Sequence, residues 1–153
     1  MNELADLSMR TWTDIDALHK AVNQIRETRA RLDTIKKWSQ DGGAAKAVID
    51  AANELEVKMA PVEARLLQVK MAASEDNLRY PNMLNEQYDT FAGTLDTEDF
   101  GPTESQRRVY EYLHGELTAE LTKWRTIADG DLPAFHSLML AHGVPSIGEA
   151  HRP

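Results

Sequence analysis

The sequence contains no cysteine among its 153 residues. A disulfide framework, a thiolate-bound zinc site, an iron–sulfur centre and a cysteine nucleophile are therefore excluded. Basic residues are scarce as well, because 17 Lys and Arg stand against 25 Asp and Glu and leave a formal charge of −8. Binding to a phosphate backbone needs a net basic face, so we expect no nucleic-acid partner.

Long apolar runs are also missing. No run approaches the roughly 20 residues that a membrane-spanning helix requires, so we expect no membrane partner. Alternating strand patterns are no more frequent than chance. With 42% hydrophobic and 27% charged residues, the composition is that of an ordinary globular protein. The length predicts one domain that covers residues 1–153.

What is present is helical periodicity. Residues 3–38 predict a first long helix, because from Ile15 onward apolar residues recur at steps of three and four, with Arg29 at the one position that breaks the stripe. Residues 44–74 predict a second helix, whose unbroken heptad pattern runs from Val48 to Val69. The short link at Gly42 and Gly43 makes these two helices antiparallel neighbours.

The second half of the chain predicts a third long helix with shorter pieces around it. Residues 75–102 form an irregular stretch with a short helix, residues 103–129 the third long helix, and residues 131–142 a short last helix. Thr103 and Gln106 have the spacing of a capping box, and Asp131 is expected to cap the last helix. The prediction is an all-α fold, an elongated up-down-up three-helix bundle with short additional helices.

The aromatic residues suggest a contact surface. Tyr110 and Tyr112 lie two residues apart on one helix and cannot both face the core. The exposed tyrosine and Trp12 would mark a surface covered by another domain or by a second copy of the chain. Scattered single aromatics are the alternative interpretation.

Two carboxylate-x-x-histidine pairs carry the only recognisable metal chemistry. Asp16 and His19 lie three residues apart on the first helix, as do Glu111 and His114 on the third, and Glu63 on the second helix falls at about the same height as His19. Such a set could hold a divalent ion, zinc or manganese. Chance alone gives about 0.8 such pairs in this composition, so ordinary surface residues are the competing interpretation.

A metal at these residues would imply a hydrolase. The ion could activate a water and neutralise charge on a small phosphoester, the substrate expected only under this hypothesis. Arg26, Arg107 and Arg108 are the candidates for holding the anionic substrate.

Four blocks of the chain, in order, resemble the C-terminal helical region of BNR/Asp-box β-propeller proteins, which are sortilin-like or glycosyl-hydrolase-like. They are residues 19–26, 77–85, 101–103 and 131–135, the last followed by residues 143–145 near the end of the chain. The propeller itself is not matched, because no Ser-x-Asp-x-Gly-x-x-Trp motif is present. The resemblance therefore implies a helical appendage and no glycosidase chemistry.

The leading functional hypothesis is a non-catalytic packing or association module that needs no cofactor. It would form a homodimer or pack on a propeller domain. The alternative is a small stand-alone, metal-dependent phosphoester hydrolase.

Overall fold

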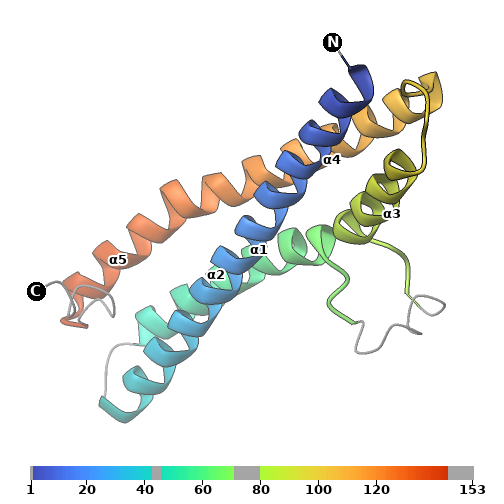
Figure 1. The fold of residues 1–153 in the computed structure, drawn as a ribbon. Helices are drawn as coiled ribbons and strands as arrows, with labels where there is room; N and C mark the ends of the chain where they lie inside the picture. The colour runs from blue at the N-terminus through green and yellow to red at the C-terminus, as the bar shows by residue number, and fades with distance from the viewer. Residues whose placement is uncertain (1, 43–45, 71–79, 145–153) are drawn as a thin grey trace, which may run out of the picture.

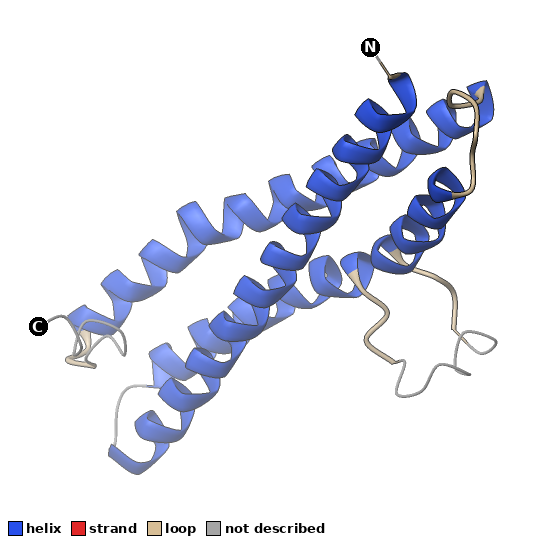
Figure 2. Ribbon diagram, viewed as in Figure 1, coloured by secondary structure: helices blue, strands red, loops and turns tan. Residues whose placement is uncertain are grey.

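The computed structural model describes residues 2–42, 46–70 and 80–144, and these form an all-α fold as predicted. Helices account for every regular element within those ranges (Figure 2). The elements are α1 (Glu3–Gly42), α2 (Lys46–Leu66), α3 (Leu84–Asp96), α4 (Glu104–Thr126), the π-helical turn η2 (Ile127–Asp131) and α5 (Leu132–Ala141).

The long helices run up, down and up (Figure 1). α2 returns antiparallel along α1, and α4 begins near the start of α1 and runs in the same sense. The short α3 packs against α1 and α4 at the end of the bundle that holds the N-terminus. None of the described helices combines the length and the apolar character that crossing a membrane demands.

The heptad residues of α2 from Val48 to Leu66 are buried, as the pattern predicts, and we call their contact with α1 the α1–α2 seam. Met59 and Leu66 of α2 are fully buried, as are Leu18 and Ile25 of α1. The prediction that this helix continues to residue 74 is wrong for residues 67–70, which are not helical, and residues 71–74 lie outside the described residues. Val69 is 49% exposed, because beyond the helix end its place in the heptad no longer turns it toward α1.

The predicted break between the third helix and the last helix is also corrected. Asp129, Gly130 and Asp131 do not interrupt the helix but form η2, which joins α4 to α5. Asp131 makes no side-chain cap, and its carboxylate instead accepts a hydrogen bond from Lys58 Nζ at 2.8 Å. Burial of Ile127 at the start of the turn and of Phe135 after it outweighs the poor helix propensity of Asp and Gly.

The other helix ends lie close to their predicted positions. Thr103 Oγ1 accepts the backbone N–H of Gln106 at 3.1 Å, and Gln106 Oε1 accepts the backbone N–H of Thr103 at 2.8 Å, so the capping box is confirmed. α1 continues past the predicted residue 38 to Gly42. Gly43, the other half of the predicted glycine link, lies outside the described residues.

Candidate functional site

Three of the five predicted metal ligands lie on α1 and α2, where two of them already have partners. His19 Nε2 lies 2.7 Å from Oδ1 of Asn85 on α3. Glu63 is buried and accepts a hydrogen bond from Arg29 Nη1 at 2.9 Å. Asp16 is exposed on the outer face of α1. The pairing with Glu63 explains why Arg29 interrupts the apolar stripe of the first helix.

The other two predicted ligands lie on α4 and have different surroundings. His114 Nδ1 lies 2.8 Å from Asp14 Oδ2. Glu111 is exposed and lines a cleft between the first turns of α1 and α4, which we call the cleft near the helix starts. Within residues 2–42, 46–70 and 80–144, no three His, Asp or Glu side chains lie close enough together to hold one ion. The structure thus places the five residues in separate surroundings.

Asp14, which the sequence analysis did not single out, is the buried centre of a polar junction whose outer residues are exposed. Its Oδ2 accepts a hydrogen bond from the Tyr88 hydroxyl at 2.9 Å as well as contacting His114. Tyr110 stacks on the His114 ring with centroids 5.5 Å apart, and the Arg10 guanidinium lies 4.8 Å from the Tyr110 centroid. We call these five residues the polar junction, and they join α1, α3 and α4.

The pKa shifts of the two tyrosines favour a structural role for the polar junction. Burial raises the pKa of the Tyr88 hydroxyl far above its ordinary value, and its hydrogen bond to Asp14 raises it further. Burial also raises the pKa of Tyr110, as does the charge of Asp14, while Arg10 opposes the shift. Both tyrosines therefore stay protonated at neutral pH, so Tyr88 acts as a fixed donor to the carboxylate.

A signal for Asp14 was present in the sequence. Leu7, Thr11, Asp14 and Leu18 follow one another at steps of four, three and four residues, which extends the apolar stripe of the first helix toward its start. Two polar residues occupy that stripe, and both Thr11 and Asp14 are buried. A polar side chain in an apolar register predicts a buried hydrogen-bonded group.

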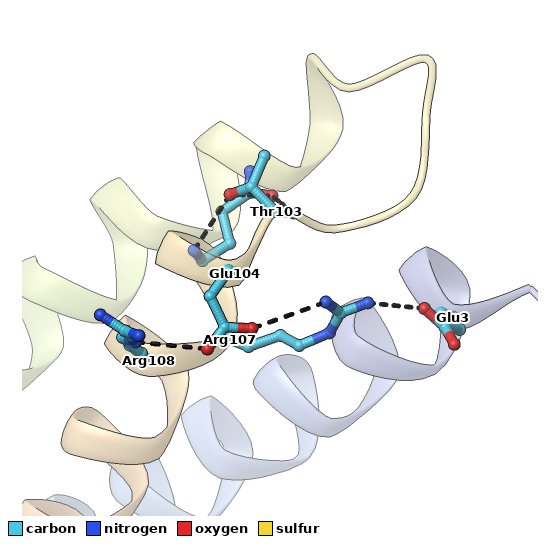
Figure 3. A network of polar contacts seen from close by, with 6 residues as sticks. Glu3, Thr103, Glu104, Arg107 and Arg108 are labelled. Atoms are coloured by element: carbon cyan, nitrogen blue, oxygen red, sulfur yellow. Dashed lines mark hydrogen bonds and ion pairs between the residues drawn. The ribbon is translucent and has the colours of Figure 1, made fainter.

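Two of the three predicted substrate-binding arginines lie together at the start of α4, in ion pairs, and the third lies apart. Arg107 Nη2 donates to Glu3 Oε2 at 2.6 Å, and Arg108 Nε donates to Glu104 Oε1 at 3.3 Å (Figure 3). Arg107 also lines the cleft that Glu111 lines, which has a volume of about 470 Å³. Arg26 is exposed on α1, about 24 Å along the helix axis from the Arg10 side of that cleft.

A larger hollow, which we call the α3–α4 groove, lies between α3 and α4 and has a volume of about 590 Å³. Buried Phe91 and Leu113 line it from the core side, and Val109 and Tyr112 line it from the surface, 42% and 58% exposed. Tyr110 is buried. The expectation that one of the two neighbouring tyrosines is exposed is therefore confirmed, and the exposed tyrosine lies in this groove.

Comparison of the chain with models of protein families, with curated proteins and with solved structures finds no match.

Proposed function

We propose that this chain is a non-catalytic helical association module, and that its α3–α4 groove binds a helix of a protein partner. The observation that carries the proposal is the exposure of Val109 and Tyr112 on a groove whose floor is apolar. Large exposed apolar side chains that gather in one hollow are typical of interaction sites, and tyrosine is enriched at interfaces. A homodimer or a propeller domain, as the resemblance implies, are two assemblies in which such a module would function.

The walls of the groove are held in place before any partner arrives. The capping box at Thr103 secures the first turn of α4. On the other wall, the hydrogen bond from Tyr88 to buried Asp14 fixes α3 to α1. A preformed surface loses little conformational entropy on binding, so more of the contact energy remains as affinity.

The test is a titration of the isotope-labelled chain, followed by NMR, with two model amphipathic helical peptides of about 18 residues, or five turns. One peptide carries leucine and lysine and the other leucine and glutamate. We expect chemical-shift changes that map to α3 and α4 for at least one peptide. Tyr112→Ser should weaken that binding about tenfold. Trp38→Ser, which removes an equally exposed aromatic from the far end of α1, should leave it unchanged.

Self-association is measured in parallel by sedimentation velocity. A concentration-dependent dimer that Tyr112→Ser dissociates would also support the module. A monomer that neither peptide perturbs at millimolar concentration would overturn the proposal.

The metal-dependent hydrolase remains a second proposal, supported by one observation. Arg107 and Glu111, predicted independently as a substrate-binding and a metal-binding residue, line the same cleft together with Arg10. Glu111 would supply one ligand of the cation, and the guanidinium groups of Arg10 and Arg107 would contact the anionic oxygens of a small phosphoester. The test is hydrolysis of a chromogenic phosphoester with added zinc or manganese, with and without chelator. A chelator-sensitive rate that Glu111→Gln abolishes would support the enzyme, and a rate that this variant leaves unchanged would remove it.

A further inference from the structure

The segment that carries the α3 wall of the α3–α4 groove is acidic. Residues 81–106, which include α3 and the connection into α4, contain six carboxylates and no Lys, Arg or His. The whole chain has a ratio of 25 acidic to 17 basic residues, so this segment is far more acidic than the rest. The six residues are Glu86, Asp89, Asp96, Glu98, Asp99 and Glu104.

Within the described ranges, one of these six carboxylates forms an ion pair. Glu104 lies within 4.0 Å of Arg107 and Arg108 and is neutralised by them. Glu86 accepts the backbone N–H of Met83 at 2.9 Å, and within the described residues no Lys or Arg pairs with it. Glu98 lines the groove itself and accepts a hydrogen bond from the neutral amide of Gln106 at 3.4 Å. The groove lining therefore carries a carboxylate that no cation of the described ranges pairs with.

The basic residue nearest to the groove-lining residues in the sequence, Arg108, forms its ion pair with Glu104 and not with Glu98. Arg108 precedes Val109 on α4, but its Nε donates to Glu104. The remaining residues that line the groove are uncharged, so Glu98 is the one formal charge in its lining. An apolar floor with a negative rim fits a ligand that has an apolar face and positive flanks.

The dimensions of the groove match a helix. α3 lines the groove from Gln87 to Thr94, which gives a wall of about 12 Å, or about two helical turns. Val109 and Tyr112 lie three residues apart on the opposite wall and would contact successive turns of a bound helix. Recognition of this kind uses apolar anchors at positions i, i+3 or i+4, and i+7 of the ligand.

We propose that the α3–α4 groove takes an amphipathic helix whose apolar stripe is flanked by Lys and Arg. This inference rests on the proposed function and adds the chemistry of the partner. A second copy of the chain that docked through the same face would bring two acidic walls together, and each copy carries a charge of −8. Charge complementarity therefore favours a basic partner helix over self-association through this groove.

The experiment compares the leucine–lysine and leucine–glutamate peptides by fluorescence anisotropy with the full chain. At about 50 mM salt we expect the lysine peptide to bind about tenfold more tightly than the glutamate peptide. At about 300 mM salt the difference should shrink, because screening weakens the rim charges. Glu98→Gln should weaken lysine-peptide binding about twofold, whereas Asp50→Asn, an equal charge change on an exposed position of α2, should not.

The outcomes separate this inference from the proposed function. If both peptides bind equally and Tyr112→Ser weakens both, the groove is a docking site and the basic partner is wrong. Binding of the lysine peptide that ignores Tyr112→Ser, or that falls equally with Asp50→Asn, is non-specific attraction to an acidic protein and also overturns the inference. A monomer that binds neither peptide removes both proposals.

Discussion

The α1–α2 seam and the polar junction hold the same helix, α1, by different means. Along the seam, Ile25 and Leu32 of α1 and Met59 of α2 are buried in an apolar core, and ion pairs such as Lys36 with Glu56 lie at its edge. In the polar junction, the charged side chain of Asp14 is itself buried, and hydrogen bonds secure it.

Stability and specificity have different physical sources in this bundle. Apolar burial is non-directional and scales with area, so the seam sets that α1 and α2 pack together. Hydrogen bonds to a buried carboxylate have strict geometry, and their loss leaves unpaired groups. The polar junction therefore sets how α3 and α4 sit on α1, and with that the shape of the α3–α4 groove.

The largest effect is expected from a charge placed in the α1–α2 seam. Leu55→Asp places an unpaired carboxylate at a buried position and should destabilise the fold by more than about 4 kcal/mol, which removes the cooperative thermal transition. Val57→Asp, two residues further on the same helix, changes a 73% exposed side chain and should cost less than about 0.5 kcal/mol. Circular dichroism melting distinguishes the two, and equal melting curves would refute the heptad assignment.

The next largest effect is expected in the polar junction. Asp14→Ala removes the acceptor of the Tyr88 hydroxyl and leaves a buried donor unpaired, which should lower the free energy of unfolding by about 2–3 kcal/mol. Asp16→Ala removes an exposed carboxylate one half-turn away and should change it by less than about 0.5 kcal/mol. Urea denaturation measures both variants, and a stable Asp14→Ala protein would show that the junction is dispensable.

An ion pair at the edge of the α1–α2 seam should have an intermediate effect on the free energy of unfolding. Arg29→Ala deprives buried Glu63 of its ion pair, and we expect a loss of about 1–2 kcal/mol because Arg29 itself is partly exposed. Arg29→Ala combined with Glu63→Ala should cost less than the sum of the two single changes. A double-mutant cycle in urea measures the coupling, and additive effects would mean that the pair contributes nothing.

The smallest effect carries a pH signature. Tyr88→Phe removes one hydrogen bond and should cost about 1 kcal/mol at neutral pH. Because the folded-state pKa of Tyr88 is raised, its contribution is complete below the unfolded pKa near 10 and is lost as pH rises above that value. The wild-type protein should therefore lose stability between about pH 10 and 12 more steeply than Tyr88→Phe. Parallel slopes in urea titrations across this range would contradict the assignment.

Prediction from the sequence was most accurate for features that depend on residues close together in the chain. The heptad from Val48 to Leu66, the capping box at Thr103 and the exposure of one of two neighbouring tyrosines depend on residues only a few positions apart. Local helix propensity also predicted a break at Gly130, between the third long helix and the last helix. Packing of Ile127 and Phe135 against the bundle outweighs that propensity and keeps the chain helical.

The candidate site was predicted less well, because its parts come from distant segments. The predicted pair on the third helix joined His114 to Glu111, whereas the structure pairs His114 with Asp14, 100 residues away in sequence. Tyr88 reaches the same carboxylate across 74 residues. Helical spacing indicates which side chains share a face but does not indicate which groups face one another across helices.

By itself, the sequence determined an all-α chain with an apolar stripe on each long helix, since periodicity is a property of neighbouring residues. Only the tertiary structure decided which polar groups meet at Asp14, that η2 carries α4 into α5, and that Val109 and Tyr112 border a groove. These features depend on how the helices pack, and helix packing is determined by the fit of whole helical surfaces to one another.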